Sequence, residues 1–181
     1  MNLPNRLTLL RMCLVPVFVA CFYLDAVLPW WNVLAAVVFT IAALTDLFDG
    51  WYARRYGLVT DFGKLLDPMA DKLLVCGAFI MLTGTGDIAP LLTFIFVGRE
   101  FIISAFRLVA AESGTVIAAG RIGKSKTLLQ CIAVVLILLD NPVFCRIGIP
   151  MDRIVLYAAL ALTIWSLVDY LYKNRKVVHR A

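Results

Sequence analysis

Four aspartates between residues 46 and 71 have the spacing of groups that act together. Asp46 and Asp49 are three residues apart, and Asp67 and Asp71 are four residues apart, so each pair falls on one face of a helix. Like charges repel at short range, so four converging carboxylates cannot all stay ionised without a counter-charge. A divalent cation supplies that charge, and ligand sets made only of oxygen suit Mg²⁺ or Mn²⁺. The spacing therefore predicts a metal centre built from carboxylates.

The residues after the first pair suit an anionic ligand beside such a centre. Gly50 and Ala53 carry little side-chain bulk, which lets a ligand or another helix come close. Arg54 carries a guanidinium, which binds phosphate through paired hydrogen bonds. We therefore expect a phosphate-bearing ligand next to the metal.

One stretch of the sequence carries this whole pattern. It reads Asp46-Leu-Phe-Asp49-Gly50-Trp-Tyr-Ala53-Arg54, then eight residues, then Gly63-Lys-Leu-Leu-Asp67-Pro-Met-Ala-Asp71. The stretch resembles the signature of the CDP-alcohol phosphotransferases, D-x-x-D-G-x-x-A-R-x8-G-x-x-x-D-x-x-x-D, and all eight defining positions match. From average composition, chance agreement at a given start is on the order of 10⁻¹⁰.

The resemblance implies a reaction and roles for individual residues. CDP-diacylglycerol would donate its phosphatidyl group to an alcohol and release cytidine monophosphate. The four aspartates would hold two metal ions, with Asp46 and Asp67 bridging them, and Asp71 would also take the proton from the attacking hydroxyl. The family positions that contact the CDP moiety correspond to Gly50, Arg54 and Thr60. Two ions suit this chemistry because they neutralise a diphosphate and stabilise both the entering and the leaving oxygen.

Within the family, the chain most resembles the members whose acceptor is glycerol 3-phosphate. The shared features are residues 4–8 with Arg11, Gly98-Arg99-Glu100, and Gly123-Lys124-Ser125-Lys126-Thr127. An acceptor of this kind needs cations for its phosphate, and the candidates are Arg99, Arg107, Lys124 and Lys126. Lys126 and Thr127 also lie at an expected helix N-terminus, where free N–H groups favour an anion.

Some of these assignments have alternatives. Arg99 can instead pair with a neighbouring acid such as Glu100, and Lys124 can serve only as a charge that orients the protein. The main alternative function is the same chemistry with inositol phosphate, serine or phosphatidylglycerol as acceptor. A cation transporter is disfavoured because the aspartates lie near one end of the expected spans and no inverted repeat is visible. A non-catalytic scaffold has little use for four spaced carboxylates.

The composition places the chain in a membrane. Of its 181 residues, 62% are hydrophobic and 16% charged, and the mean hydropathy is +0.91. Soluble domains contain about 45–50% apolar residues, and a globule of this size cannot bury more apolar surface than that. The composition therefore excludes a soluble protein, a disordered chain and a disulfide scaffold. The net charge of +5 indicates contact with anionic membrane lipids and not with nucleic acid, because no basic soluble domain is present.

Six apolar stretches predict the architecture. They run approximately over residues 7–24, 30–50, 65–82, 88–111, 125–139 and 153–172. A bilayer is crossed by roughly 20 apolar residues, so we expect an all-α polytopic protein with six transmembrane helices in a single domain over residues 1–181. We also expect Asp169 near the end of the last stretch to pair with Lys173, four residues further on.

The distribution of charge predicts the orientation. Basic residues concentrate before the first stretch, between the second and third, between the fourth and fifth, and in the C-terminal tail. Because such residues stay cytoplasmic, both termini and the active site are expected to face the cytoplasm, as in a multi-pass protein of the bacterial inner (plasma) membrane. The resemblance further implies a homodimer. The cysteines in the apolar stretches are expected to be small buried thiols.

Overall fold

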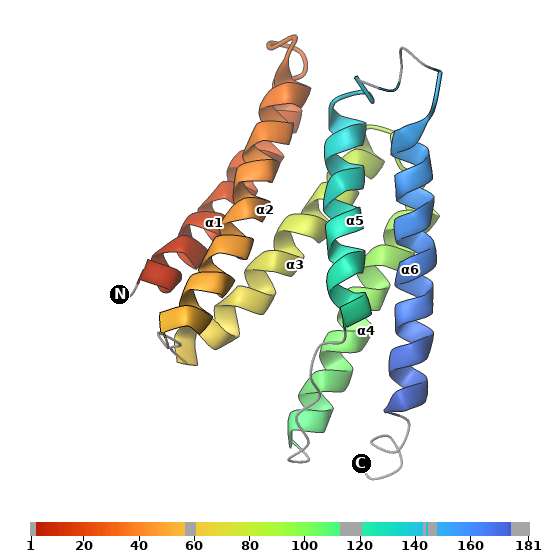
Figure 1. The fold of residues 1–181 in the computed structure, drawn as a ribbon. Helices are drawn as coiled ribbons and strands as arrows, with labels where there is room; N and C mark the ends of the chain where they lie inside the picture. Colours follow the sequence, from red (N-terminus) through yellow and green to blue (C-terminus); the bar gives the residue numbers. More distant parts are fainter. Residues whose placement is uncertain (1–2, 57–60, 113–120, 143, 145–147, 175–181) are drawn as a thin grey trace.

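The computed structural model describes residues 3–56, 61–112, 121–142, 144 and 148–174. Side chains are described within these ranges except at 3–6, 46–56, 61–68, 71, 111–112, 121–122 and 124. Throughout the described ranges the chain is helical, with irregular connections and no strand (Figure 1). The all-α part of the predicted fold class is therefore confirmed.

Each predicted apolar stretch corresponds to one helix. In chain order, the described elements are α1 (Leu3–Cys21), the short 3-10 helix η1 (Phe22–Leu24), α2 (Trp31–Tyr56), α3 (Asp61–Gly84), α4 (Pro90–Glu112), α5 (Arg121–Leu138) and α6 (Met151–Lys173). Successive helices run in opposite directions. The start of α1, the facing ends of α2 and α3, the facing ends of α4 and α5, and the end of α6 all lie toward the lower side of Figure 1.

Two of these helices are longer than hydropathy predicts. The apolar stretches end near Gly50 and resume near Leu65, whereas α2 continues to Tyr56 and α3 already begins at Asp61. Hydropathy marks only the part of a helix that suits lipid, and polar residues extend a helix as readily as apolar ones. Most of the signature is therefore helical, whereas the apolar stretches alone would leave residues 51–64 as a connection.

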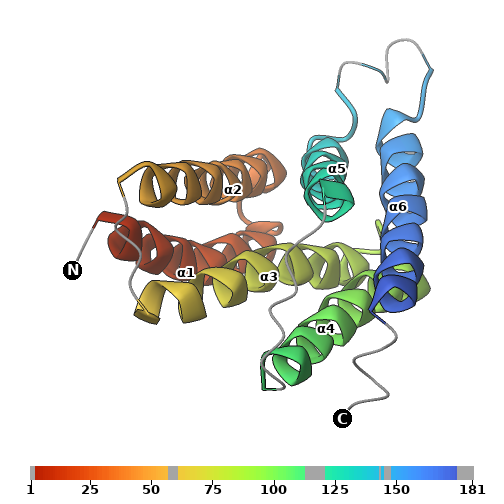
Figure 2. The same cartoon turned by 60° about the horizontal axis from the view of Figure 1, so that its bottom comes forward.

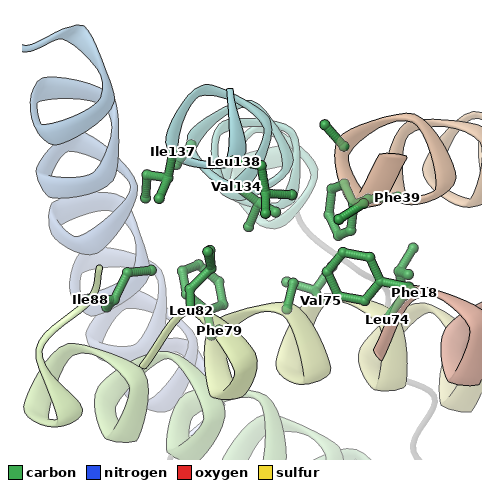
Figure 3. Packing of buried hydrophobic residues seen from close by; sticks show 14 of the residues in the cluster. Phe18, Phe39, Leu74, Val75, Phe79, Leu82, Ile88, Val134, Ile137 and Leu138 are labelled. Atoms are coloured by element: carbon green, nitrogen blue, oxygen red, sulfur yellow. The ribbon is translucent and has the colours of Figure 1, made fainter. Parts of the chain in front are cut away.

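The helices associate in two groups that share a core. Helix α1 packs against α2 and α3, α5 packs against α6, and α4 contacts both α3 and α6 (Figure 2). Contacts of α5 with α2 and α3 join the groups. In the core between α3 and α5, Phe79 and Leu82 face Val134 and Leu138 (Figure 3). The rings of Phe79 and Phe96 stack with centroids 4.3 Å apart, which fixes α3 against α4.

Small residues allow the close approach of the first helices. Ala35, Ala36 and Ala42 on α2 are almost fully buried, next to Phe39, whose ring centroid is 5.5 Å from that of Phe18 on α1. In a membrane, helices associate through such packing because lipid provides no hydrophobic driving force between them. The small alanine side chains and the contact between Phe39 and Phe18 thus explain why α1 and α2 lie side by side.

The outer surface is apolar, whereas several polar groups are inside. Large apolar side chains are more than 40% exposed on every helix, among them Val17, Val37, Ile80, Phe94, Leu128 and Val168. Arg11, Lys126, Gln130 and Thr163 are at most 1% exposed. Within the described residues, two apolar segments are long enough to cross a bilayer, 7–24 and 151–173, and shorter ones span 31–45, 72–84 and 125–138. This arrangement indicates a membrane protein.

Candidate active site

The signature aspartates occupy matched depths on two adjoining helices. Asp46 lies ten residues before the end of α2, and Asp71 lies ten residues after the start of α3, about 15 Å along each helix at 1.5 Å per residue. Asp49 and Asp67 lie seven and six residues from the same ends, about 10 Å along each helix. Helices α2 and α3 contact each other, and only four residues of the sequence separate their facing ends. The backbone therefore brings the two pairs to the same level.

The side chains of these four aspartates lie outside the described part of the structure, as do those of Gly50 and Arg54, and Thr60 lies outside the described residues altogether. Among the side chains that are described, no group of three or more acidic, histidine or cysteine residues could hold a metal ion. The metal and CDP assignments thus rest on helix position and on the donor types, four carboxylates, which suit a divalent cation.

Two of the four predicted acceptor cations meet at one carboxylate. Arg99 Nη1 on α4 donates to Glu100 Oε1 over 3.1 Å, and Lys126 Nζ on α5 donates to the same oxygen. The alternative pairing of Arg99 with Glu100 is therefore confirmed. The pairing of Glu100 with Lys126 is not evident from the sequence, because 26 residues separate them.

Arg99 also links α4 to α6. Its Nη2 donates a hydrogen bond of 3.0 Å to Ser166 Oγ, and the residue is only 8% exposed. Its Nε is buried and has no hydrogen-bond partner within the described part of the chain. Because an unsatisfied buried donor is costly, this N–H is available to an anion that enters the cluster.

A small cavity connects this cluster with the signature helix α3. It is lined by Lys72, Val75, Glu100, Thr127 and Gln130, which come from α3, α4 and α5. Lys72 directly follows the signature residue Asp71, and its Nζ donates a hydrogen bond to Ser104 Oγ on α4. Ser104 in turn donates to the backbone oxygen of Glu100 over 2.5 Å. The cavity has a volume of about 10 Å³, enough for one water molecule, and lies where α3, α4 and α5 meet.

The other two predicted cations are placed differently. Arg107 is exposed on α4, and its Cζ lies 5.8 Å from the centroid of the Tyr170 ring on α6, a cation–π contact. The side chain of Lys124 lies outside the described part of α5. The predicted pair of Asp169 and Lys173 is confirmed, with 2.8 Å between Oδ2 and Nζ. This pair is accessible to solvent, so it marks the surface of α6 and not the site.

Several polar residues of the cluster were missed by the sequence analysis. Ser166 accepts from Arg99, and Ser104 donates to the backbone of Glu100 and accepts from Lys72, yet single hydroxyl residues in apolar stretches are common and carry no spacing signal. The buried pair of Gln130 and Thr163, whose Nε2 and Oγ1 atoms are 3.5 Å apart, joins α5 to α6.

Comparison with known proteins places this arrangement in a family. Residues 1–165 match the family model of the CDP-alcohol phosphatidyltransferases, which covers α1 to α5 and most of α6. A Bacillus subtilis (strain 168) protein named CDP-diacylglycerol–glycerol-3-phosphate 3-phosphatidyltransferase is 41% identical over 184 residues, covering 96% of this chain and 95% of the relative. Proteins of the same name from Rickettsia bellii (strain RML369-C) and Sodalis glossinidius (strain morsitans) are 37% and 40% identical, each covering 97% of this chain and 96% of the relative. The resemblance of the signature thus extends over the whole fold, and the chain belongs to the CDP-alcohol phosphatidyltransferase family.

Proposed function

We propose that the chain transfers the phosphatidyl group of CDP-diacylglycerol to glycerol 3-phosphate, giving phosphatidylglycerophosphate and cytidine monophosphate in phospholipid biosynthesis. The observation that carries this proposal is the likeness, over nearly the full length, to several proteins named for this reaction. The eight matching signature positions support the donor, and the buried cations on α4 and α5 support an acceptor that carries phosphate.

The donor half of the site would lie between α2 and α3. Asp46, Asp49, Asp67 and Asp71 would hold two Mg²⁺ or Mn²⁺ ions. When bound, such ions would neutralise the diphosphate and stabilise the entering and leaving oxygens of an in-line displacement. The CDP moiety would be bound by Gly50, Arg54 and Thr60. Asp71 would accept the proton of the attacking hydroxyl, a role open to a carboxylate within hydrogen-bond reach of it.

The acceptor half would lie between α3, α4 and α5. Arg99 and Lys126 would bind the phosphate of glycerol 3-phosphate beside the cavity that Lys72 and Glu100 line, and Arg107 and Lys124 would attract it at the edge. Lys72, the residue after Asp71, lines this cavity, so an acceptor bound by its phosphate at these cations would lie near the signature segment of α3 and would present its hydroxyl to Asp71. Orientation of this kind lowers the entropic part of the barrier.

The membrane arrangement follows from the same proposal. All six helices would cross the membrane as one domain over residues 1–181, with both termini and the site on the cytoplasmic side of a bacterial inner membrane. The alternating helix directions support this topology (Figure 1), as does the apolar outer surface. The active unit would be a homodimer.

The test is an assay of the purified protein in detergent micelles with CDP-diacylglycerol and Mg²⁺ or Mn²⁺. Release of cytidine monophosphate would be measured with glycerol 3-phosphate, inositol phosphate, serine or phosphatidylglycerol in turn. We expect release only with glycerol 3-phosphate, and only with a divalent ion present. Release that depends on another acceptor would contradict glycerol 3-phosphate as the acceptor but would still support transfer of the phosphatidyl group.

A further inference from the structure

One carboxylate oxygen holds two buried cations from different helices. Glu100 Oε1 accepts from Arg99 Nη1 on its own helix and from Lys126 Nζ on α5. The Lys126 side chain is 1% exposed and that of Arg99 is 9% exposed, whereas the Glu100 side chain is 15% exposed. The acid is therefore the member of the cluster that lies nearest to accessible space, and it lines the cavity toward α3.

The carboxylate of Glu100 compensates the buried charge of Lys126. A charged side chain inside a membrane helix is expensive unless a partner or a polar cavity receives it. Removing one member of a buried ion pair leaves the other charge uncompensated, and a flexible lysine then withdraws toward water or loses its proton. Either change would take the ammonium of Lys126 away from its present position beside Arg99.

A second observation indicates that the cluster is arranged for an anion. Arg99 uses Nη1 for Glu100 and Nη2 for Ser166, which holds the plane of the guanidinium from two helices. Its remaining buried donor, Nε, has no partner within the described part of the chain. A cluster that served only to join helices would satisfy this donor, because an unmade hydrogen bond costs stability.

We propose that Glu100 is a positioning residue of the acceptor site, which holds Arg99 and Lys126 where they bind the phosphate of the acceptor. This inference rests on the proposed function and adds to it a residue that does not touch the substrate. Glu100 acts through the two cations: it holds the ammonium of Lys126 in place, and it fixes one edge of the Arg99 guanidinium. The phosphate is bound before and throughout the reaction, so loss of this positioning weakens substrate binding more than it slows the chemical step.

The first test is Glu100→Gln, which keeps the size of the side chain and removes its charge. We expect the KM for glycerol 3-phosphate to rise at least roughly tenfold, the effect of losing one hydrogen bond between charged groups. The Ki of inorganic phosphate as a competitor of glycerol 3-phosphate should rise in parallel, while the KM for CDP-diacylglycerol and kcat stay close to their original values. The matched control is Asp169→Asn, which removes the carboxylate of a surface ion pair with Lys173 and should change none of these constants.

The second variant, Glu100→Asp, keeps the charge that the buried cations need and shortens the side chain by one methylene. Size-exclusion chromatography and thermal unfolding in detergent would identify the folded variants. In folded Glu100→Gln, an unchanged KM for glycerol 3-phosphate, or a fall in kcat with both KM values unchanged, would overturn the positioning role. Glu100→Asp should raise this KM less than Glu100→Gln does, and a rise as large as that of Glu100→Gln would overturn the role assigned to the charge. If the unmodified protein releases no cytidine monophosphate in response to glycerol 3-phosphate, the proposed function itself fails, which is a separate result.

Discussion

The guanidinium of Arg99 on α4 is tied to the hydroxyl of Ser166 on α6 by a hydrogen bond of 3.0 Å from Nη2 to Oγ. Ser166 Oγ also donates to the backbone oxygen of Thr163 over 3.0 Å, so the hydroxyl accepts from the cation and donates to its own helix. Both Arg99 and Ser166 are buried. A single serine therefore orients the arginine that we assign to the acceptor phosphate.

Replacing this hydroxyl should reduce stability. Ser166→Ala leaves the Arg99 Nη2 donor unsatisfied in a buried environment, which costs about 1–3 kcal/mol of unfolding free energy. Thermal unfolding of the purified protein in detergent measures the loss. The matched comparison is Ser166→Thr, which keeps the hydroxyl and should retain most of the stability. Equal stability of the alanine and threonine variants would contradict the role of the hydroxyl.

Loss of a predicted metal ligand should abolish activity without unfolding the protein. Asp46→Asn and Asp67→Asn keep the side-chain size and remove the charge that a divalent ion requires. We expect no measurable release of cytidine monophosphate from either variant, with insertion and thermal unfolding unchanged. Asp169→Asn, at a surface carboxylate, is the control and should remain fully active. Near-normal turnover of Asp46→Asn at saturating Mg²⁺ would contradict the metal centre.

Arg107 offers a test of the acceptor site that does not disturb the core. Its side chain is exposed and rests over the Tyr170 ring, so Arg107→Ala should leave thermal unfolding nearly unchanged. We expect the KM for glycerol 3-phosphate to rise at least roughly tenfold and the KM for CDP-diacylglycerol to stay the same. Thr60→Ala should raise the KM for CDP-diacylglycerol and leave the KM for glycerol 3-phosphate unchanged. Equal effects of Arg107→Ala on both substrates would mean that the cation binds the diphosphate.

Lys126→Ala should differ from Arg107→Ala in stability. It removes the α5 partner of Glu100, a half-buried carboxylate, and within the described side chains leaves Arg99 as its ion-pair partner. We expect both a KM for glycerol 3-phosphate raised at least roughly tenfold and a lower temperature of thermal unfolding. Initial rates at varied acceptor concentration and a thermal scan test the two effects separately. An unchanged unfolding temperature would mean that the ion pair contributes nothing to the fold.

The proposed topology predicts which connections are accessible from outside the cell. In a cysteine-free background, a single cysteine at Asp87 or Asp140 should react with a membrane-impermeant maleimide added to intact cells. A cysteine at Thr60 or Arg121 should react only after the membrane is opened. External labelling at Thr60 would mean that the protein has the opposite orientation, with the site on the side of the membrane away from the soluble acceptor.

The helices could be predicted from the sequence because hydropathy reports the part of each helix that suits lipid. The ends of the helices could not be predicted from hydropathy, since residues such as Arg54 and Arg55 extend α2 beyond its apolar stretch without a change in local conformation. The result is that the signature lies on two long helices at matched depths. The aspartate spacing already contained this information, because separations of three and four residues imply a helix.

The acceptor cluster was only partly predictable. Arg99 and Glu100 are sequence neighbours, so their pairing could be considered from the sequence, whereas the contact of Lys126 with Glu100 depends on where the tertiary fold places α5 relative to α4. Such a contact has no local signature, because the two residues belong to different helices. The same holds for Ser166, whose partner is 67 residues away.

The apolar surface of this protein and the polar groups buried within its apolar core have a consequence for its evolution. Positions such as Val37, Phe94 and Val168 face outward, where one apolar side chain can replace another at little cost, since lipid solvates them alike. Thr163, Ser166 and Gln130 are inside, and there the loss of one polar atom leaves a partner without its hydrogen bond. Substitutions should therefore accumulate among the large apolar residues of the exterior and be rare among the polar residues of the interior. In a water-soluble protein the variable exterior residues are mostly polar and the constrained interior residues mostly apolar, so the residue types are exchanged.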